Sequence, residues 1–256
     1  MSYSNLKPSE NSAEGQVDFI STTTFAMYGL SDKINLKMRI PFIWRNKEVD
    51  NNTESTSGFS DISIGLRTIV SNKIVGPGNK IFLDANLSIP TAKSFSTNPL
   101  EEDSGMDMGM MGMDDNFAMG TGQYSASLGL EYWVRSEFPW VIGSSAEIKF
   151  PLNTSDIGFK PGQKSKLDLH LIRQKPIIKS IHPYFKISLR HADIDKWGGV
   201  DGENSGGLYL DGFGQMNFEL NERTSLILSV GLPIWDDIKG SQLRGMSGSV
   251  SLRFTK

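Results

Sequence analysis

A strict two-residue alternation between apolar and polar side chains is the feature that most constrains this chain. In residues 34–45, INLKMRIPFIWR, the apolar face carries Ile34, Leu36, Met38, Ile40, Phe42 and Trp44. The other face carries Asn35, Lys37, Arg39, Pro41 and Arg45. The pattern outlasts the roughly 5–6 residues of an ordinary globular strand and reaches the ~9–11 residues that a tilted strand needs to cross a bilayer. We therefore expect an all-β fold, a transmembrane antiparallel up-and-down β-barrel.

The chain length and hydropathy agree with one such barrel. The chain has 256 residues, a length that all-β barrels commonly use as one domain. Its mean hydropathy is −0.27, and no stretch approaches the ~18 consecutive apolar residues of a membrane-spanning helix. Since only every second residue of a barrel strand faces lipid, a negative mean hydropathy is compatible with a membrane location. We expect residues 1–256 to form a single outer-membrane β-barrel domain.

Charge and cysteine usage exclude several classes of protein. The formal net charge is −3, and Lys and Arg are scattered, so no basic field for nucleic acid exists. The absence of cysteine excludes disulfides, thiolate catalysis and Cys-based zinc sites. No positively charged segment followed by an apolar stretch opens the chain, so we expect either a removed signal peptide or a truncated start.

Alternation recurs in about eleven segments separated by turn residues. The expected strands lie at about 16–30, 34–45, 61–71, 80–91, 123–135, 140–152, 164–173, 183–191, 207–220, 224–235 and 245–255. Short connections after Leu30 and at 76–78, 136–139, 174–182 and 221–223 alternate with long ones, the longest at about 92–122. Short periplasmic turns and long extracellular loops are typical of an outer-membrane barrel.

The number of strands should be even, because bacterial single-chain barrels have even strand numbers. The first recognised strand runs toward a short turn, which leaves one strand unaccounted for. We expect that strand to be missing upstream or barely represented by residues 2–4, and the complete barrel to have about twelve strands.

Aromatic residues fall near the expected strand ends, where amphipathic rings favour the headgroup level. The set comprises Tyr28, Trp44, Tyr132, Trp140, Trp235 and Phe254. These residues are candidates for interfacial girdles, although aromatic side chains also cap the ends of ordinary sheets.

The polar face would surround the axis of such a barrel. The expected pore-lining residues are Lys37, Arg39, Arg67, Asp84, Glu131, Glu147, Lys149, Asp168, Arg190, Asp211, Gln215 and Glu219. Burying so many ions in a closed core would cost several kcal/mol each, so they must be hydrated or paired. A barrel of about twelve strands lies between filled barrels of ~8 strands and open porins of ~16–18. A narrow pore, a plugged pore and a wall merely stiffened by salt bridges all remain open.

Four prolines share a position near the loop-side end of a strand and point to the polar face. They are Pro41, Pro90, Pro151 and Pro233. Because proline lacks an N–H and is confined to strand edges, ends and bulges, each should loosen the ladder locally. A constriction ring and plain strand termination both explain the four prolines.

The longest loop contains the segment GMDMGMMGMDD, in which five of the chain's 11 methionines lie close together. They are Met106, Met108, Met110, Met111 and Met113. Thioethers are soft ligands that select Cu(I), which makes copper a candidate ligand here and the only cofactor we consider. The alternative is an adaptable apolar loop that plugs the barrel mouth or contacts a partner protein.

Catalytic motifs are missing from the sequence. It contains neither a GxSxG elbow nor an HExxH pair, and its three histidines are scattered. His191 with Asp193 is the one weak candidate for a lipid-facing catalytic site. We expect a protein that is not an enzyme.

Five segments occur in an order that resembles a known family: YGLSDKINLKMRIPF (28–42), SGFSDISIGLRTIV (57–70), DANLSIPTAK (84–93), GTGQYSASLGLEYW (120–133) and LNERTSLILSVGLPI (220–234). The chain resembles the outer-membrane family named for the MetA pathway of phenol degradation, a loose architectural relative of the long-chain fatty-acid transporter barrels. The resemblance implies an outer-membrane barrel that transports small, aromatic or apolar solutes, and it supplies no catalytic residues. The methionine-rich stretch is not part of the family pattern.

The sequence as a whole predicts a porin-like channel in the outer membrane of a Gram-negative cell. Its expected partners are outer-membrane lipid, small solutes that cross passively, and a protein at the loops or periplasmic turns; nucleic acid is not expected. The alternative is a structural or partner-docking barrel with a closed lumen.

Overall fold

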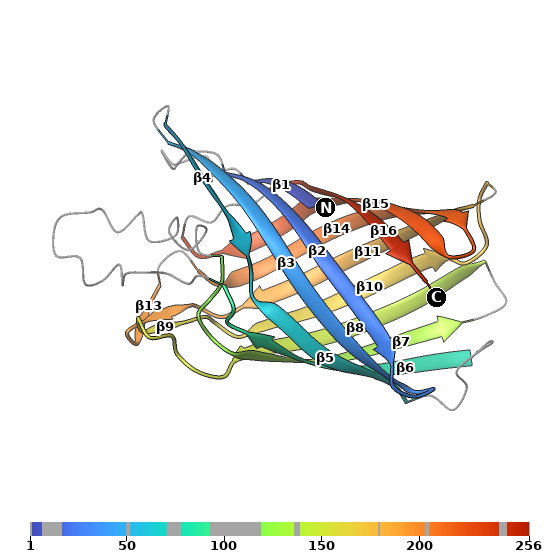
Figure 1. The fold of residues 1–256 in the computed structure, drawn as a ribbon, viewed down its shortest axis with the longest axis horizontal. Coiled ribbons are helices and arrows are strands. Elements are labelled where there is room, and N and C mark those ends of the chain that lie inside the picture. Colours follow the sequence, from blue (N-terminus) through green and yellow to red (C-terminus); the bar gives the residue numbers. More distant parts are fainter. Residues whose placement is uncertain are drawn as a thin grey trace.

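The fold comes from a computed structural model that describes residues 2–6, 17–49, 52–70, 78–92, 119–135, 139–178, 180–202, 205–240 and 245–255. The described part of the chain consists of strands and their connections (Figure 1). No helix in it is long and apolar enough to cross a membrane.

The wall strands are β1 (Ser2–Leu6), β2 (Val17–Gly29), β3 (Ile34–Val49), β4 (Asn52–Phe59), β5 (Ile62–Ile69), β6 (Gly78–Ile89), β7 (Ser125–Arg135), β8 (Trp140–Pro151), β10 (Lys164–Arg173), β11 (Ile181–Ala192), β14 (Gly207–Asn221), β15 (Thr224–Ile238) and β16 (Ser247–Phe254). Three two-residue strands, β9 (Phe159–Lys160), β12 (Lys196–Trp197) and β13 (Val200–Asp201), form a separate small sheet.

Strand pairing closes the wall into a barrel. All pairs of wall strands are antiparallel and most join successive strands; β1 pairs with both β2 and β16, and β2 also pairs with β3. The sheet has 13 strands, but β4 and β5 pair with successive halves of β3 and serve as one wall strand, which makes twelve. The expected antiparallel up-and-down barrel of about twelve strands is confirmed.

The strand that completes the even number is β1. It lies between β2 and β16, with the pairs Ser2↔Ser21 and Ser2↔Ser249 on its two sides. Of the two alternatives for the unaccounted strand, the structure supports a short one at the start of the chain.

Side-chain alternation turns the apolar rows outward. Ile34, Leu36 and Met38 are exposed by 39%, 37% and 39%, whereas the side chain of the intervening Lys37 is only 15% exposed. In the closing strand, Leu252 and Phe254 are exposed by 59% and 75%. An exposed apolar surface this extensive is foreign to soluble monomers and matches the lipid-facing band of a membrane barrel.

Exposed aromatic side chains lie toward both ends of that band. Tyr28 and Phe254 lie at the end with the short connections, and Trp44 and Trp235 lie toward the loop end. This arrangement is the one expected of interfacial girdles.

The connection between residues 45 and 61 differs from the sequence-based prediction, which placed a long loop there. Strand β3 continues to Val49, and β4 starts again at Asn52. Residues 53–58, TESTSG, carry no apolar side chain on either face, so alternation does not reveal the strand, yet its backbone pairing with β3 continues the ladder.

The small sheet stands at the loop end of the barrel, opposite the short connections (Figure 1). Phe159 and Trp197 are 4% and 3% exposed, and their ring centroids are 4.5 Å apart. The loops at this end of the barrel therefore carry a packed core of their own.

Candidate functional site: the barrel lumen

A connected chain of charged side chains runs over the inner face of strands β3 to β7. Lys37 donates to Asp84 across the intervening strand β5. Arg67 lies 3.6 Å from Asp84 and binds Glu131 with two hydrogen bonds, Nη1 to Oε1 at 3.1 Å and Nη2 to Oε2 at 2.5 Å. Trp133 Nε1 donates to the same carboxylate at 3.1 Å. Two parallel N–H donors fix the Arg67 fork against Glu131 geometrically.

A second set of ion pairs lies on β8, β10, β11 and β14. Lys166 is 3.2 Å from Glu147 and 3.5 Å from Asp168. Arg190 binds Asp211 through Nε at 2.8 Å and Nη2 at 2.5 Å. The pairs Lys166–Glu147 and Arg190–Asp211 join neighbouring strands and so link the inner wall, whereas Lys166 and Asp168 both lie on β10.

An aromatic and hydroxyl cluster separates the two sets of charges. Trp133 lies over Gly143, where an added Cβ would come within 2.3 Å of the indole ring. The rings of Trp133 and His170 are 5.0 Å apart, and His170 Nδ1 is hydrogen-bonded to the Tyr184 hydroxyl at 2.8 Å. The other ring nitrogen of His170 lies 3.0 Å from Ser145 Oγ. Gly143 is required here because any side chain would displace the indole.

The twelve residues predicted to line the pore all lie on the inward face of their strands. Residues paired directly across antiparallel strands have their side chains on the same face of the sheet. Following these pairs from strand to strand places all twelve on one face, from β3 through β5, β6, β7, β8, β10 and β11 to β14 and β15. Lys37, Arg67, Asp84, Glu131, Glu147, Asp168, Arg190, Asp211 and Glu219 have ion-pair partners within 4 Å. Within the described residues, Arg39, Lys149 and Gln215 have neither an ion pair nor a hydrogen bond from their side chains.

Sequence reasoning missed two apolar residues of the lumen. Phe25 pairs with Arg39 and Met27 pairs with Lys37, so both share the inward face, yet they are 58% and 55% exposed. Alternation alone does not assign a face to β2, whose TTTFAM segment is weakly patterned. The pairing register with β3 assigns it.

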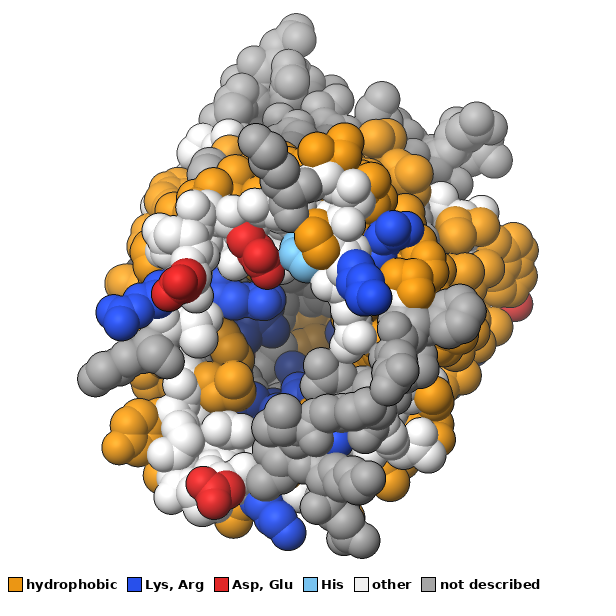
Figure 2. Space-filling view, turned by 90° about the vertical axis from the view of Figure 1, so that its right-hand side faces the viewer, with side chains coloured by type: hydrophobic (Ala, Val, Ile, Leu, Met, Phe, Trp, Pro, Cys, Tyr) orange, Lys and Arg blue, Asp and Glu red, His pale blue; other side chains and the backbone are white. Residues whose placement is uncertain are grey.

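The barrel is hollow when viewed from the end with the short connections. Figure 2 shows a central opening with Lys and Arg side chains inside it. Toward one wall, a cavity of about 350 Å³ is lined by residues that include Arg67, Lys80, Phe82 and Trp133.

The four prolines lie either at an irregularity of the ladder or at the end of a strand. Pro41 lies where β3 changes partner from β5 to β4, and its carbonyl accepts a hydrogen bond from Ser60 N at 2.9 Å. Pro151 is the last residue of β8 and Pro90 directly follows β6. Pro233 is adjacent to the register shift at Leu210/Asp211. Pro41 and Pro233 thus lie at irregularities within the ladder, Pro90 and Pro151 lie where strands terminate, and a constriction at these prolines stays a prediction.

The methionines proposed as copper ligands, Met106, Met108, Met110, Met111 and Met113, lie outside the described residues. In the described part of the chain, no group of three or more His, Asp or Glu side chains could hold a metal ion. Copper binding therefore stays a prediction from the sequence.

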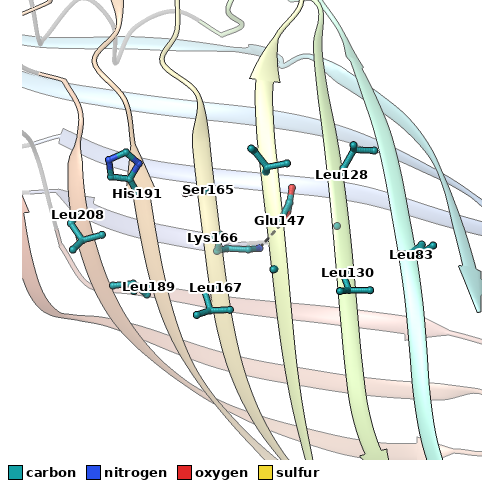
Figure 3. A pocket seen from close by; sticks show the side chains of 13 residues that line it. Leu83, Leu128, Leu130, Glu147, Ser165, Lys166, Leu167, Leu189, His191 and Leu208 are labelled. Atoms are coloured by element: carbon teal, nitrogen blue, oxygen red, sulfur yellow. Dashed lines mark ion pairs between the residues drawn. The ribbon is translucent and has the colours of Figure 1, made fainter. Parts of the chain in front are cut away.

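The outer wall carries a groove of about 530 Å³ that runs across β6 to β14 (Figure 3). Its leucines, among them Leu128, Leu130 and Leu167, come from the apolar rows that face outward. His191 lies at one end, with Nδ1 3.9 Å from Asp193 Oδ1. No hydrogen bond between described residues joins the pair to a serine hydroxyl, so the geometry does not assemble a catalytic relay.

Solved structures that are similar to this chain include an outer membrane channel and a porin. The COG4313 outer membrane channel from Pseudomonas putida F1 matches with a TM-score of 0.76 and 11% sequence identity, over 99% of this chain and 92% of that chain. The NanC porin matches with a TM-score of 0.52 and 6% identity, over 100% of this chain and 99% of that chain. At these identities the likeness establishes the fold.

The closed wall, the apolar exterior and these likenesses define the chain as an outer-membrane β-barrel located in the cell outer membrane. No protein-family model matches the chain, and no curated protein matches it. The resemblance to the MetA-pathway family is therefore confirmed only at the level of an outer-membrane barrel, and the family name is not confirmed.

Proposed function

We propose that this barrel is a passive channel through which small hydrophilic solutes diffuse across the outer membrane. The observation that carries the proposal is the exposure of Phe25 and Met27 on the inward face. In a filled barrel, apolar side chains on that face would be buried against each other. Their exposure above one half requires open space in front of them.

The charges of the lumen support the same function. Ions taken out of water into a closed core cost several kcal/mol each, a cost that hydration in an open lumen avoids. A lining of Lys, Arg, Asp and Glu also replaces part of the hydration shell of a polar solute as it passes. Pore diameter and lining charge then determine which solutes pass. The COG4313 channel and the NanC porin, whose fold this chain shares, are named as a channel and a porin rather than as enzymes.

Planar-bilayer recording of the refolded chain tests the proposal directly. We expect stepwise unitary currents that grow with salt concentration, because dissolved ions carry current through an aqueous pore. A barrel that inserts without producing any unitary current, and that releases no small solute from liposomes, would overturn the proposal and favour the docking barrel with a closed lumen.

Cysteine chemistry locates the conducting path, since the chain contains no cysteine of its own. The variant Phe25→Cys places a thiol on the inward face, and Leu228→Cys places one on the lipid-facing side. A charged, water-soluble thiol reagent should modify Phe25→Cys and reduce its current while leaving Leu228→Cys unchanged. Reaction only at the outward position would contradict an open lumen.

A further inference from the structure

Carboxylates and basic side chains of the lumen differ in how many of them have an ion-pair partner. Five carboxylates among the predicted pore-lining residues have a Lys or Arg partner within 4 Å: Asp84, Glu131, Glu147, Asp168 and Asp211. The sixth, Glu219, lies 3.3 Å from Nε2 of His182. On the same face, Arg39, Lys149, Lys164 and Lys186 have no ion pair with a described carboxylate. Among the described residues on this face, cations without an ion pair therefore outnumber carboxylates without one, although the whole chain has a net charge of −3.

Three of these cations form a cluster toward the loop end of the lumen, and we call Arg39, Lys149 and Lys164 the cationic cluster. Lys149 and Lys164 are direct cross-strand partners on β8 and β10. Lys149 also interacts electrostatically with Arg39 of β3. All three residues are exposed. Like charges placed directly opposite each other destabilise a sheet, so this arrangement costs folding energy.

Two acidic residues near the cluster, both in the described part of the chain, are already engaged. Glu147 is paired with Lys166 at 3.2 Å. Asp61 accepts hydrogen bonds from Thr121 N at 3.0 Å, Thr121 Oγ1 at 3.2 Å and Ala92 N at 3.3 Å. These carboxylates weaken the positive field at Lys149 without pairing with it.

We infer that the cationic cluster is an anion-binding site in the pore, which makes the channel prefer small carboxylates and phosphates over cations. The inference deepens the proposed function and rests on it. An anion between Lys149 and Lys164 relieves their mutual repulsion, whereas a cation is repelled by all three side chains. Because the cluster is exposed to water, the anion is held weakly and can leave again, as conduction requires.

The reversal potential of the reconstituted channel under a KCl gradient measures this preference. The ionic strength should stay near 0.1 M, where the Debye length of about 10 Å leaves the field of the cluster unscreened across a narrow lumen. We expect the wild-type channel to favour chloride over potassium. The double variant Lys149→Gln and Lys164→Gln should lower the chloride-to-potassium permeability ratio by about twofold or more, from the Coulomb energy of two charges at pore distances.

Matched variants separate the cluster from a general effect of charge. Lys33→Gln removes a lysine from the exposed turn between β2 and β3 and should leave the permeability ratio unchanged. Arg39→Gln tests the cluster from another strand, in case the double variant fails to insert. Inorganic phosphate at millimolar concentration should reduce the wild-type chloride current more than that of the double variant.

The outcomes distinguish this inference from the proposed function. Unitary currents that prefer potassium, or a ratio that the cluster variants do not change, would refute the anion site and leave the channel intact. A wild-type barrel without currents would refute both.

Discussion

Arg67 of β5 holds Glu131 of β7 by two hydrogen bonds that pass over the inner face of β6. The pair joins residues 64 positions apart in sequence and is about three-quarters shielded from solvent, with side-chain exposures of 24% and 25%. Its shielding lies between that of a surface ion pair, worth ~0–1 kcal/mol, and that of a buried pair, whose breakage costs ~3–5 kcal/mol.

Removal of this guanidinium should destabilise the barrel. The variant Arg67→Leu leaves Glu131 without its cation and Asp84 with Lys37 alone, so we expect a loss of about 2–3 kcal/mol in the free energy of unfolding. Urea titration of the barrel in lipid vesicles measures this loss. Arg223→Leu, in the exposed turn between β14 and β15, serves as a control that should stay within about 0.5 kcal/mol of wild type. Equal losses in the two variants would show that the pair does not stabilise the wall.

The outward-facing apolar rows predict that the cost of an arginine substitution, in the free energy of unfolding, depends strongly on its depth in the membrane. Leu169 lies in the middle of β10 and is 58% exposed, and Leu152 follows the end of β8 and is 52% exposed. Arginine at the first position should cost about 2–4 kcal/mol and at the second about 0–1 kcal/mol, because only the first charge enters hydrocarbon. Unfolding of both variants in vesicles measures the difference. If Leu152→Arg is at least as damaging as Leu169→Arg, the assigned membrane span is wrong.

Much of the wall could be predicted because most strands show apolar–polar alternation within their own residues. Strand β10 spans 164–173, as the alternation in KSKLDLHLIR indicates. The two faces of that segment differ so strongly that a shift of one residue would expose its charges to lipid. The hydrophobic pattern therefore fixes both the strand and the side of the wall on which each residue lies.

The parts that escaped prediction depend on contacts between distant residues. Phe159 and Trp197 meet in a sheet of two-residue strands, too short for any periodicity. Lys37 meets Asp84 because of the pairing register of β3, β5 and β6. The sequence does not specify which residue of one strand pairs with which residue of the next. The faces of strongly alternating strands were thus predictable, whereas the face of β2 and most side-chain partners were not.

Asp61 is another residue whose role emerges only from the fold. It lies in the break between β4 and β5 and accepts hydrogen bonds from Ala92 N and Thr121 N, at the two ends of the longest connection. Hydrogen bonds to a charged acceptor contribute about 1.5–3 kcal/mol. In Asp61→Ala we expect these two amides to exchange hydrogen at least about tenfold faster, since 1.4 kcal/mol corresponds to a factor of ten.

Exchange measured by mass spectrometry or NMR tests the role of Asp61. Asp61→Asn keeps an acceptor oxygen and should fall between Asp61→Ala and wild type. Asp156→Ala, at an exposed position in another loop, controls for loss of a carboxylate. Unchanged protection of Ala92 and Thr121 in Asp61→Ala would mean that other contacts hold the ends of the connection together.

The small sheet should unfold independently of the barrel. Trp197 is 3% exposed and supplies much of the core that this sheet buries, so Trp197→Ala should cost about 3–5 kcal/mol locally. The amides of Gly198 and Gly202, which donate to Gly158 O at 2.9 Å and Asp195 O at 2.8 Å, should then exchange about a hundredfold faster or more.

The barrel wall should keep its stability in Trp197→Ala, because β10 and β11 are held by their own ladder of cross-strand pairs. Amides in the middle of β10 should keep their wild-type exchange rates in Trp197→Ala, and the urea midpoint of the barrel should stay the same. Val200→Ala, at a position of the small sheet that is 59% exposed, should change neither set of amides. A Trp197→Ala variant in which β10 loses protection together with Gly198 would show that the loop core and the barrel unfold as one cooperative unit.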